Sequence, residues 1–198
     1  KKRKLVWQQL ANFASLGSLA GGTALALQLG HRYSYDFDLF ASKPLSTKLI
    51  LSVQKVFGKK IEQLVNSSHE LSFLTKDKVK VSFIFFPFPA LHRLVKTKSV
   101  SLLSLSDLAS SKAYTIGRRG EYRDYVDLFF LLKNGLKLEK IIKEAETRFG
   151  GAFSKRLFLQ QLVYFSDFKN YRIDFLDQSY STKEILEFFK KEIKKYKF

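Results

Sequence analysis

The chain has 198 residues, 45% of them hydrophobic, which is enough for one domain of moderate size or two small domains that share an interface. Its formal net charge of +17 favours polyanionic partners such as nucleic acid, nucleotides or an anionic membrane surface, although a Lys-rich composition also follows from an AT-rich genome. Cysteine is absent and only three His are present, which excludes disulfides and thiolate metal sites and makes Mg²⁺ or Mn²⁺, held by oxygen ligands, the metal to expect.

The opening KKRKLVWQQLANF lacks the apolar core and the small-residue cleavage site of a signal peptide. No apolar run approaches the roughly 20 residues that cross a bilayer. We therefore expect a cytoplasmic protein that does not insert into a membrane.

The first half of the chain predicts mixed helices and strands. Apolar periodicity predicts helices at residues 5–15, 23–29 and 46–58, with the Gly21-Gly22 pair as a tight turn before the second of them. Alternating patterns predict strands at residues 33–40, 70–75 and 78–87.

The second half predicts helices alone. From about residue 101 apolar residues recur at spacings of three to four, and Gly and Pro become sparse. Helices are expected at residues 106–117, 121–133, 137–148, 154–166 and 182–196. Without an internal repeat or a low-complexity linker, the two halves should pack on each other.

Two acids stand one residue apart in the third predicted element, GHRYSYDFDLF. On a strand at residues 33–40, Ser34, Asp36 and Asp38 project from one face, so the two carboxylates can hold one divalent cation or bridge two. The alternative is a pair of acids on a solvent-exposed face.

The glycine turn comes directly before this acidic strand. Gly21, Gly22 and Thr23 open a predicted helix, and the free N–H groups at a helix N-terminus attract phosphate. The alternative is an ordinary tight turn.

A glycine turn, a short buried helix and a strand bearing S-x-D-x-D, in this order, resemble the front end of the nucleotidyltransferase superfamily. Two stretches of the chain resemble the AbiEii/AbiGii toxin family. They are GGTALALQLGHRYSYDFDLF and SLSDLASSKAYTIGRRGEYRDYVDLFFLL, the second of which ends at residue 132. The resemblance spans roughly residues 18–135.

The resemblance implies an α+β fold, with a nucleotidyltransferase-type mixed sheet and flanking helices followed by a C-terminal helical bundle. Residues 1–100 would form the α/β core, and residues 101–198 a helical domain that contributes to the site. It also implies metal-dependent transfer of an NMP from an NTP to an acceptor such as tRNA, and a toxin encoded beside a cognate antitoxin.

Site residues follow from the same motifs. By resemblance, the nucleotide phosphates lie at the glycine turn, at Ser34 and at Lys112. Asp36 and Asp38 would be the metal ligands, and Asp124 or Asp127 the late catalytic carboxylate. These last two share a helix face, and spacing does not choose between them, although the family's DL pattern favours Asp127.

Basic residues near the motifs are further candidates. His31 and Arg32 match the family's HR pair, which orders a loop or touches substrate. Arg119 and Arg123 are possible RNA contacts, with a solvated surface as the alternative.

One position departs from polymerase-like relatives. The place of a third strand carboxylate falls on Ser82, which cannot act as a charged metal ligand or a strong general base. This leaves open a catalytically decayed module that binds RNA through charge. A third alternative, an interaction or membrane-surface protein, rests on the amphipathic segment 182–198.

Overall fold

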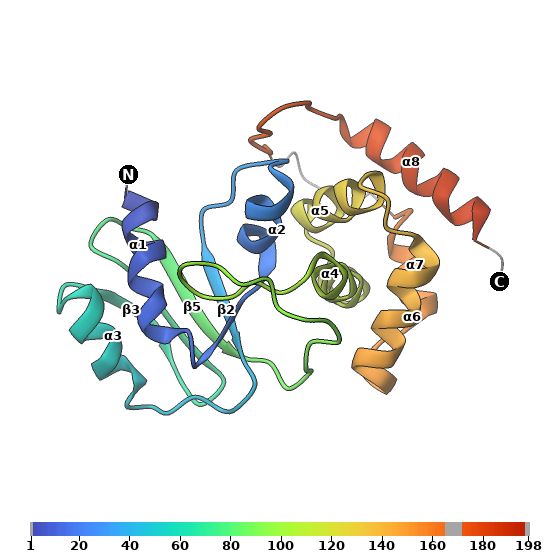
Figure 1. The fold of residues 1–198 in the computed structure, drawn as a ribbon. Helices are drawn as coiled ribbons and strands as arrows, with labels where there is room; N and C mark the ends of the chain where they lie inside the picture. Colours follow the sequence, from blue (N-terminus) through green and yellow to red (C-terminus); the bar gives the residue numbers. More distant parts are fainter. Residues whose placement is uncertain (1, 165–171, 197–198) are drawn as a thin grey trace. The chain divides into compact units, whose positions relative to one another are not determined.

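The computed structural model describes residues 2–164 and 172–196, apart from the side chain of Arg119. The chain divides into two compact units (Figure 1). The first contains Lys1–Ala24 and Ser34–Ser104, and the second contains Leu25–Tyr33 and Leu105–Phe198. The helix α2 (Gly21–Leu29) therefore begins in the first unit and ends in the second.

A five-stranded mixed sheet forms the first unit, in the order β1-β2-β5-β4-β3. The parallel pair β2 and β5 lies in the middle, and the other neighbouring strands are antiparallel. This confirms the expected mixed sheet. Its strands are β1 (Gly17–Leu19), β2 (Phe37–Ala41), β3 (Glu62–Asn66), β4 (Glu70–Leu74) and β5 (Lys80–Phe85).

One face of this sheet is covered by α1 (Lys2–Leu10) and α3 (Leu49–Phe57), which lie on the same side of the strands in Figure 1. Phe13, in a 3₁₀ turn after α1, has its ring 5.0 Å from that of Phe83, and the rings of Phe57 and Phe73 are 5.2 Å apart. Because side chains alternate along a strand, Asp38 lies on the opposite face from these rings.

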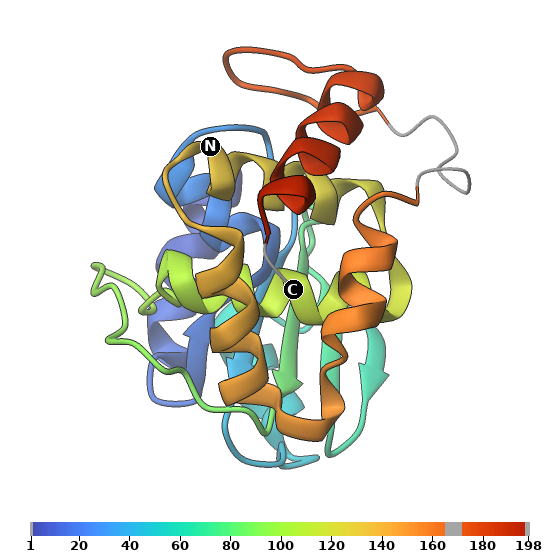
Figure 2. The same ribbon diagram turned by 90° about the vertical axis from the view of Figure 1, so that its right-hand side faces the viewer.

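The second unit is helical, as expected. Figure 2 shows α6 and α7 (orange), both of which pack on α4. The helix α8 packs against α5 and buries Ile185 and Phe189. That burial removes most of the support for a membrane-surface helix. The helices are α4 (Leu105–Arg119), α5 (Tyr122–Lys133), α6 (Leu138–Phe149), α7 (Lys155–Gln161) and α8 (Thr182–Lys195).

Some element boundaries differ from the sequence predictions. The acidic strand begins at Phe37 and not at residue 33, because Tyr33 N donates to the Asp174 carbonyl, 2.8 Å away, and Ser34 is tied to Thr23. The strands β1 and β3 were not predicted, since the first has three residues and the second is exposed throughout. The helix expected at residues 154–166 ends at Gln161, and residues 165–166 of that prediction lie outside the described residues. Within the described residues, none of the helices combines the length and the apolar character needed to span a membrane.

Candidate functional site

The turn from β1 into α2 brings the backbone close to Asp38. Gly21 has φ +62°, and a Cβ at this position would lie 2.9 Å from Asp38 Oδ2. Ala20 N also donates to the Asp38 carbonyl, at 2.8 Å. The start of α2 is thus held beside a carboxylate, and the approach depends on the missing side chain of glycine.

Thr23 fastens the start of α2 to the segment before β2. Its hydroxyl is buried, lies 2.9 Å from Ser34 Oγ and donates to the Asp36 carbonyl. In the structure, the hydroxyls of Thr23 and Ser34 therefore hold the segment that carries Asp36 in place.

The donor set around the two acids fits Mg²⁺ or Mn²⁺. Asp38 is the second residue of β2, Asp36 directly precedes the strand, and both are partly exposed. Among the described residues no three His, Asp or Glu side chains gather as metal ligands. Magnesium is commonly bound by one or two carboxylates and completes its shell with water and substrate phosphate, so two carboxylates suffice.

Next to Asp38 in the sheet lies Ser82, its partner in the parallel pairing of β2 and β5. Ser82 is also paired with Ser72 on β4, with 3.0 Å between the two hydroxyl oxygens. The Ser72 hydroxyl in turn donates to Glu70 Oε1. Glu70 was missed by the sequence analysis, although E-x-S at the start of a strand places both side chains on one face.

In the second unit, Lys112 lies between two carboxylates. Its Nζ is 2.7 Å from Asp124 Oδ1 and 2.6 Å from Asp127 Oδ2, and all three side chains are buried. Burial alone would lower the pKa of Lys112, but the charges of Asp127 and Asp124 raise it above its ordinary value. Lys112 is therefore a buried, paired ammonium group and not a solvated helix lysine.

Asp127 is the centre of a larger buried cluster. Arg32 binds it through two nitrogens, with Nε 2.7 Å from Oδ1 and Nη2 2.9 Å from Oδ2, and His31 Nε2 lies 2.8 Å from Oδ1. Burial alone would raise the pKa of Asp127, but Lys112, His31 and Arg32 hold it well below its usual range. His31 and Arg32 thus fix the backbone after α2 to the helix α5.

The two acids of α5 differ in how fully their oxygens are used. Both oxygens of Asp127 accept hydrogen bonds, whereas Asp124 Oδ2 is buried with no hydrogen-bond partner among the described residues. Arg123 is exposed and paired with Glu121, 2.6 Å away, so it lies apart from this cluster. The side chain of Arg119 falls outside the described residues.

A family model for the nucleotidyl transferase AbiEii toxin, type IV TA system, matches residues 9–195. The chain belongs to this family. It is therefore a nucleotidyltransferase-type transferase of a toxin family, as the sequence motifs indicated.

One relative in sequence and two solved structures are similar to this chain. An uncharacterised protein of Aquifex aeolicus (strain VF5) is 32% identical over 209 residues, covering 99% of this chain and 98% of that protein. MenT4, a nucleotidyltransferase toxin of Mycobacterium tuberculosis H37Rv, shares the fold with a TM-score of 0.67 at 13% identity, over 96% of this chain and 80% of its own. JHP933 of Helicobacter pylori has a TM-score of 0.55 at 17% identity, and the match covers 98% of this chain and 92% of that protein.

Proposed function

We propose that this AbiEii-family chain transfers an NMP group from an NTP to an RNA acceptor such as tRNA, with Mg²⁺ or Mn²⁺ held by Asp36 and Asp38. The observation that supports the proposal is the approach of the α2 N-terminus to Asp38. A helix N-terminus attracts phosphate, and a carboxylate beside it can hold a divalent cation. The acceptor hydroxyl forms the new O–P bond, and pyrophosphate leaves.

The bound metal would supply charge neutralisation at the phosphates. The protein would contribute positioning: the glycine-turn amides at Gly21 and Gly22 hold phosphate oxygens, and the Thr23 hydroxyl keeps Asp36 in place. The high positive charge favours an RNA acceptor, which a protein binds mainly through phosphates.

We propose that Lys112 and Asp124 of the second unit are also required for transfer. Asp124 is the better candidate for the late carboxylate, because its Oδ2 has no partner among the described residues whereas Asp127 is fully bonded. Asp124 would take the proton of the attacking hydroxyl, and Lys112 would balance the charge.

The biological role proposed is that of a toxin paired with a cognate antitoxin, in keeping with the description of the family as a type IV toxin–antitoxin system.

The test incubates the protein with each α-labelled NTP, Mg²⁺ or Mn²⁺, and total tRNA. The double variant Asp36→Asn, Asp38→Asn should lose transfer. A matched variant, Asp77→Asn, Asp177→Asn, makes the same two changes at acids that are not proposed as metal ligands, and it should keep transfer. Label on RNA only with the intact pair establishes the transferase and names its nucleotide.

Other outcomes redirect the proposal. Label on protein would show a protein acceptor. If no label is transferred while tRNA still binds, the decayed RNA-binding module replaces the enzyme.

A further inference from the structure

Three polar residues lie side by side in a row across the three neighbouring strands β2, β5 and β4. Asp38, Ser82 and Ser72 are register partners on β2, β5 and β4, so their side chains project from the same face. Ser82 and Ser72 are 2% and 1% exposed. Burying a hydroxyl costs stability unless it is hydrogen-bonded, so the hydrogen bonds of Ser82 and Ser72 decide whether the fold tolerates them.

Glu70 determines which hydroxyl of the row donates and which accepts. A hydroxyl has one hydrogen to donate, and an ionised carboxylate can only accept. Ser72 donates to Glu70 Oε1, so the 3.0 Å contact between the two serines must be completed by the Ser82 hydrogen. The Ser82 oxygen is then left with lone pairs, next to the strand that carries Asp38.

We propose that Glu70, Ser72 and Ser82 form a hydrogen-bonded relay that replaces the third strand carboxylate of polymerase-like relatives. The relay fixes Ser82 as an acceptor for a water molecule on the metal at Asp36 and Asp38. Glu70 and Ser72 are positioning residues that act through Ser82. This inference rests on the metal site of the proposed function.

The experiment measures Mn²⁺ binding by electron paramagnetic resonance, without nucleotide or turnover, for the wild type, Glu70→Ala, Ser82→Ala and the double variant. Each single variant should weaken Mn²⁺ binding about tenfold, in the range expected for partners of metal ligands. The double variant should also lose about tenfold, since both changes break one relay. Additive losses would instead indicate that Glu70 acts through charge alone, and would overturn the relay.

Two controls separate the relay from folding and from the proposed function. Ser110→Ala removes another buried serine, which bonds the Asp107 carbonyl at 3.0 Å in the second unit, and should leave Mn²⁺ binding unchanged. Thermal unfolding of every variant confirms that it folds.

The proposed function and the relay fail in different ways. Mn²⁺ binding that is lost in Asp36→Asn, Asp38→Asn but unchanged in the relay variants rejects the relay alone. Absence of binding to the wild type rejects the metal site and the relay together. If binding responds to the relay variants while NMP transfer is absent, the relay stands and the transferase does not.

Discussion

Asp127 shows how a single residue can match a catalytic motif and yet be occupied by structural contacts. Its motif favoured a late catalytic acid, but its side chain is fully buried and bound by Arg32, His31 and Lys112. Helix spacing predicted that Asp124 and Asp127 share a face. The pairing with residues 31 and 32 is a tertiary contact, about which the periodicity of α5 carries no information.

Asp127→Asn should lower the free energy of unfolding by about 3–5 kcal/mol, because it removes the charge that the buried Arg32 pairs with and one of the two carboxylates beside Lys112. Urea unfolding at pH 7 measures this loss. The matched change Asp77→Asn breaks an exposed pair with Lys2 and should cost less than about 1 kcal/mol. Equal losses in both variants would contradict the buried cluster.

Asp127 should also make the stability of the protein depend on pH in the acid range. The pKa of Asp127 is held well below its unfolded value of about 3.9, so its stabilising contribution is present above about pH 4 and is lost as pH falls further. Between about pH 4 and pH 2 the wild type should therefore lose more stability than Asp127→Asn. Parallel curves for the two proteins would show that Asp127 does not titrate abnormally.

Among the elements, those with strong sequence patterns were predicted best. The apolar periodicity of α5 and α8 gave their ends to within about one residue of those observed. The acidic strand was predicted too long, because alternation continues through residues whose hydrogen bonds go elsewhere. The strand β1 has only three residues and β3 is exposed throughout, so neither shows an alternating pattern that predicts a strand.

The turn that begins α2 allows a paired test. Gly21→Ala would place a side chain on a residue with positive φ, which is strained, and would bring its Cβ 2.9 Å from Asp38 Oδ2. Gly30→Ala has a similar φ of +64° with no atom within 4 Å, so it carries the same strain, about 1 kcal/mol, without the clash. NMP transfer and Mn²⁺ binding should fall at least tenfold for Gly21→Ala only. A similar loss in both variants would show that backbone strain, and not the approach to Asp38, is responsible.

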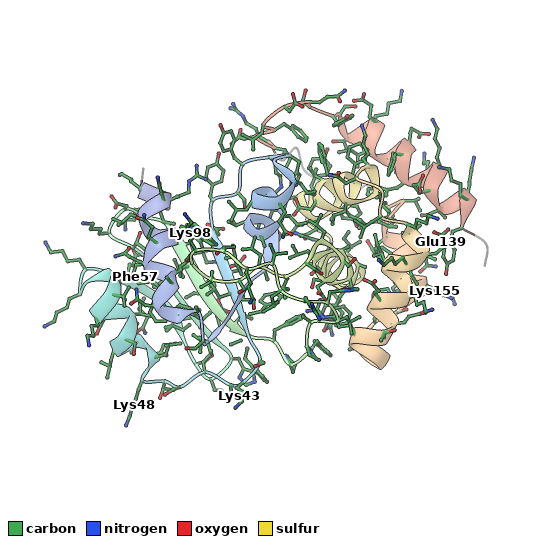
Figure 3. All side chains as sticks on the ribbon, viewed as in Figure 1. Lys43, Lys48, Phe57, Lys98, Glu139 and Lys155 are labelled. Carbon is green, nitrogen blue, oxygen red and sulfur yellow. The ribbon has the colours of Figure 1, made fainter. Side chains whose placement is uncertain are left out.

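For the whole molecule, the excess of positive charge is the property most directly available from sequence. Exposed lysines occur on both units, including Lys43, Lys48 and Lys98 on the first and Lys155 on the second, all labelled in Figure 3. Composition gave the sign and size of this charge. The identity of the polyanion depends on surface shape, which composition does not encode.

Binding of tRNA should weaken steeply with salt. If about six phosphates are contacted, affinity should fall roughly 10³-fold between 50 and 200 mM salt. Fluorescence anisotropy with labelled tRNA measures the slope of log K against log salt. Asp36→Asn, Asp38→Asn should keep this slope, since neither acid contributes cations. A flat salt response would argue against a phosphate-bound acceptor.

The path of the chain through α2 has a consequence for how the protein can be divided. The backbone passes from the first unit to the second within this helix, returns after Tyr33, and crosses again after Ser104. A cut at residue 104 would leave His31 and Arg32 on one fragment and their partner Asp127 on the other. We therefore expect that neither fragment folds by itself, because a cut at residue 104 removes the buried carboxylate that His31 and Arg32 bind.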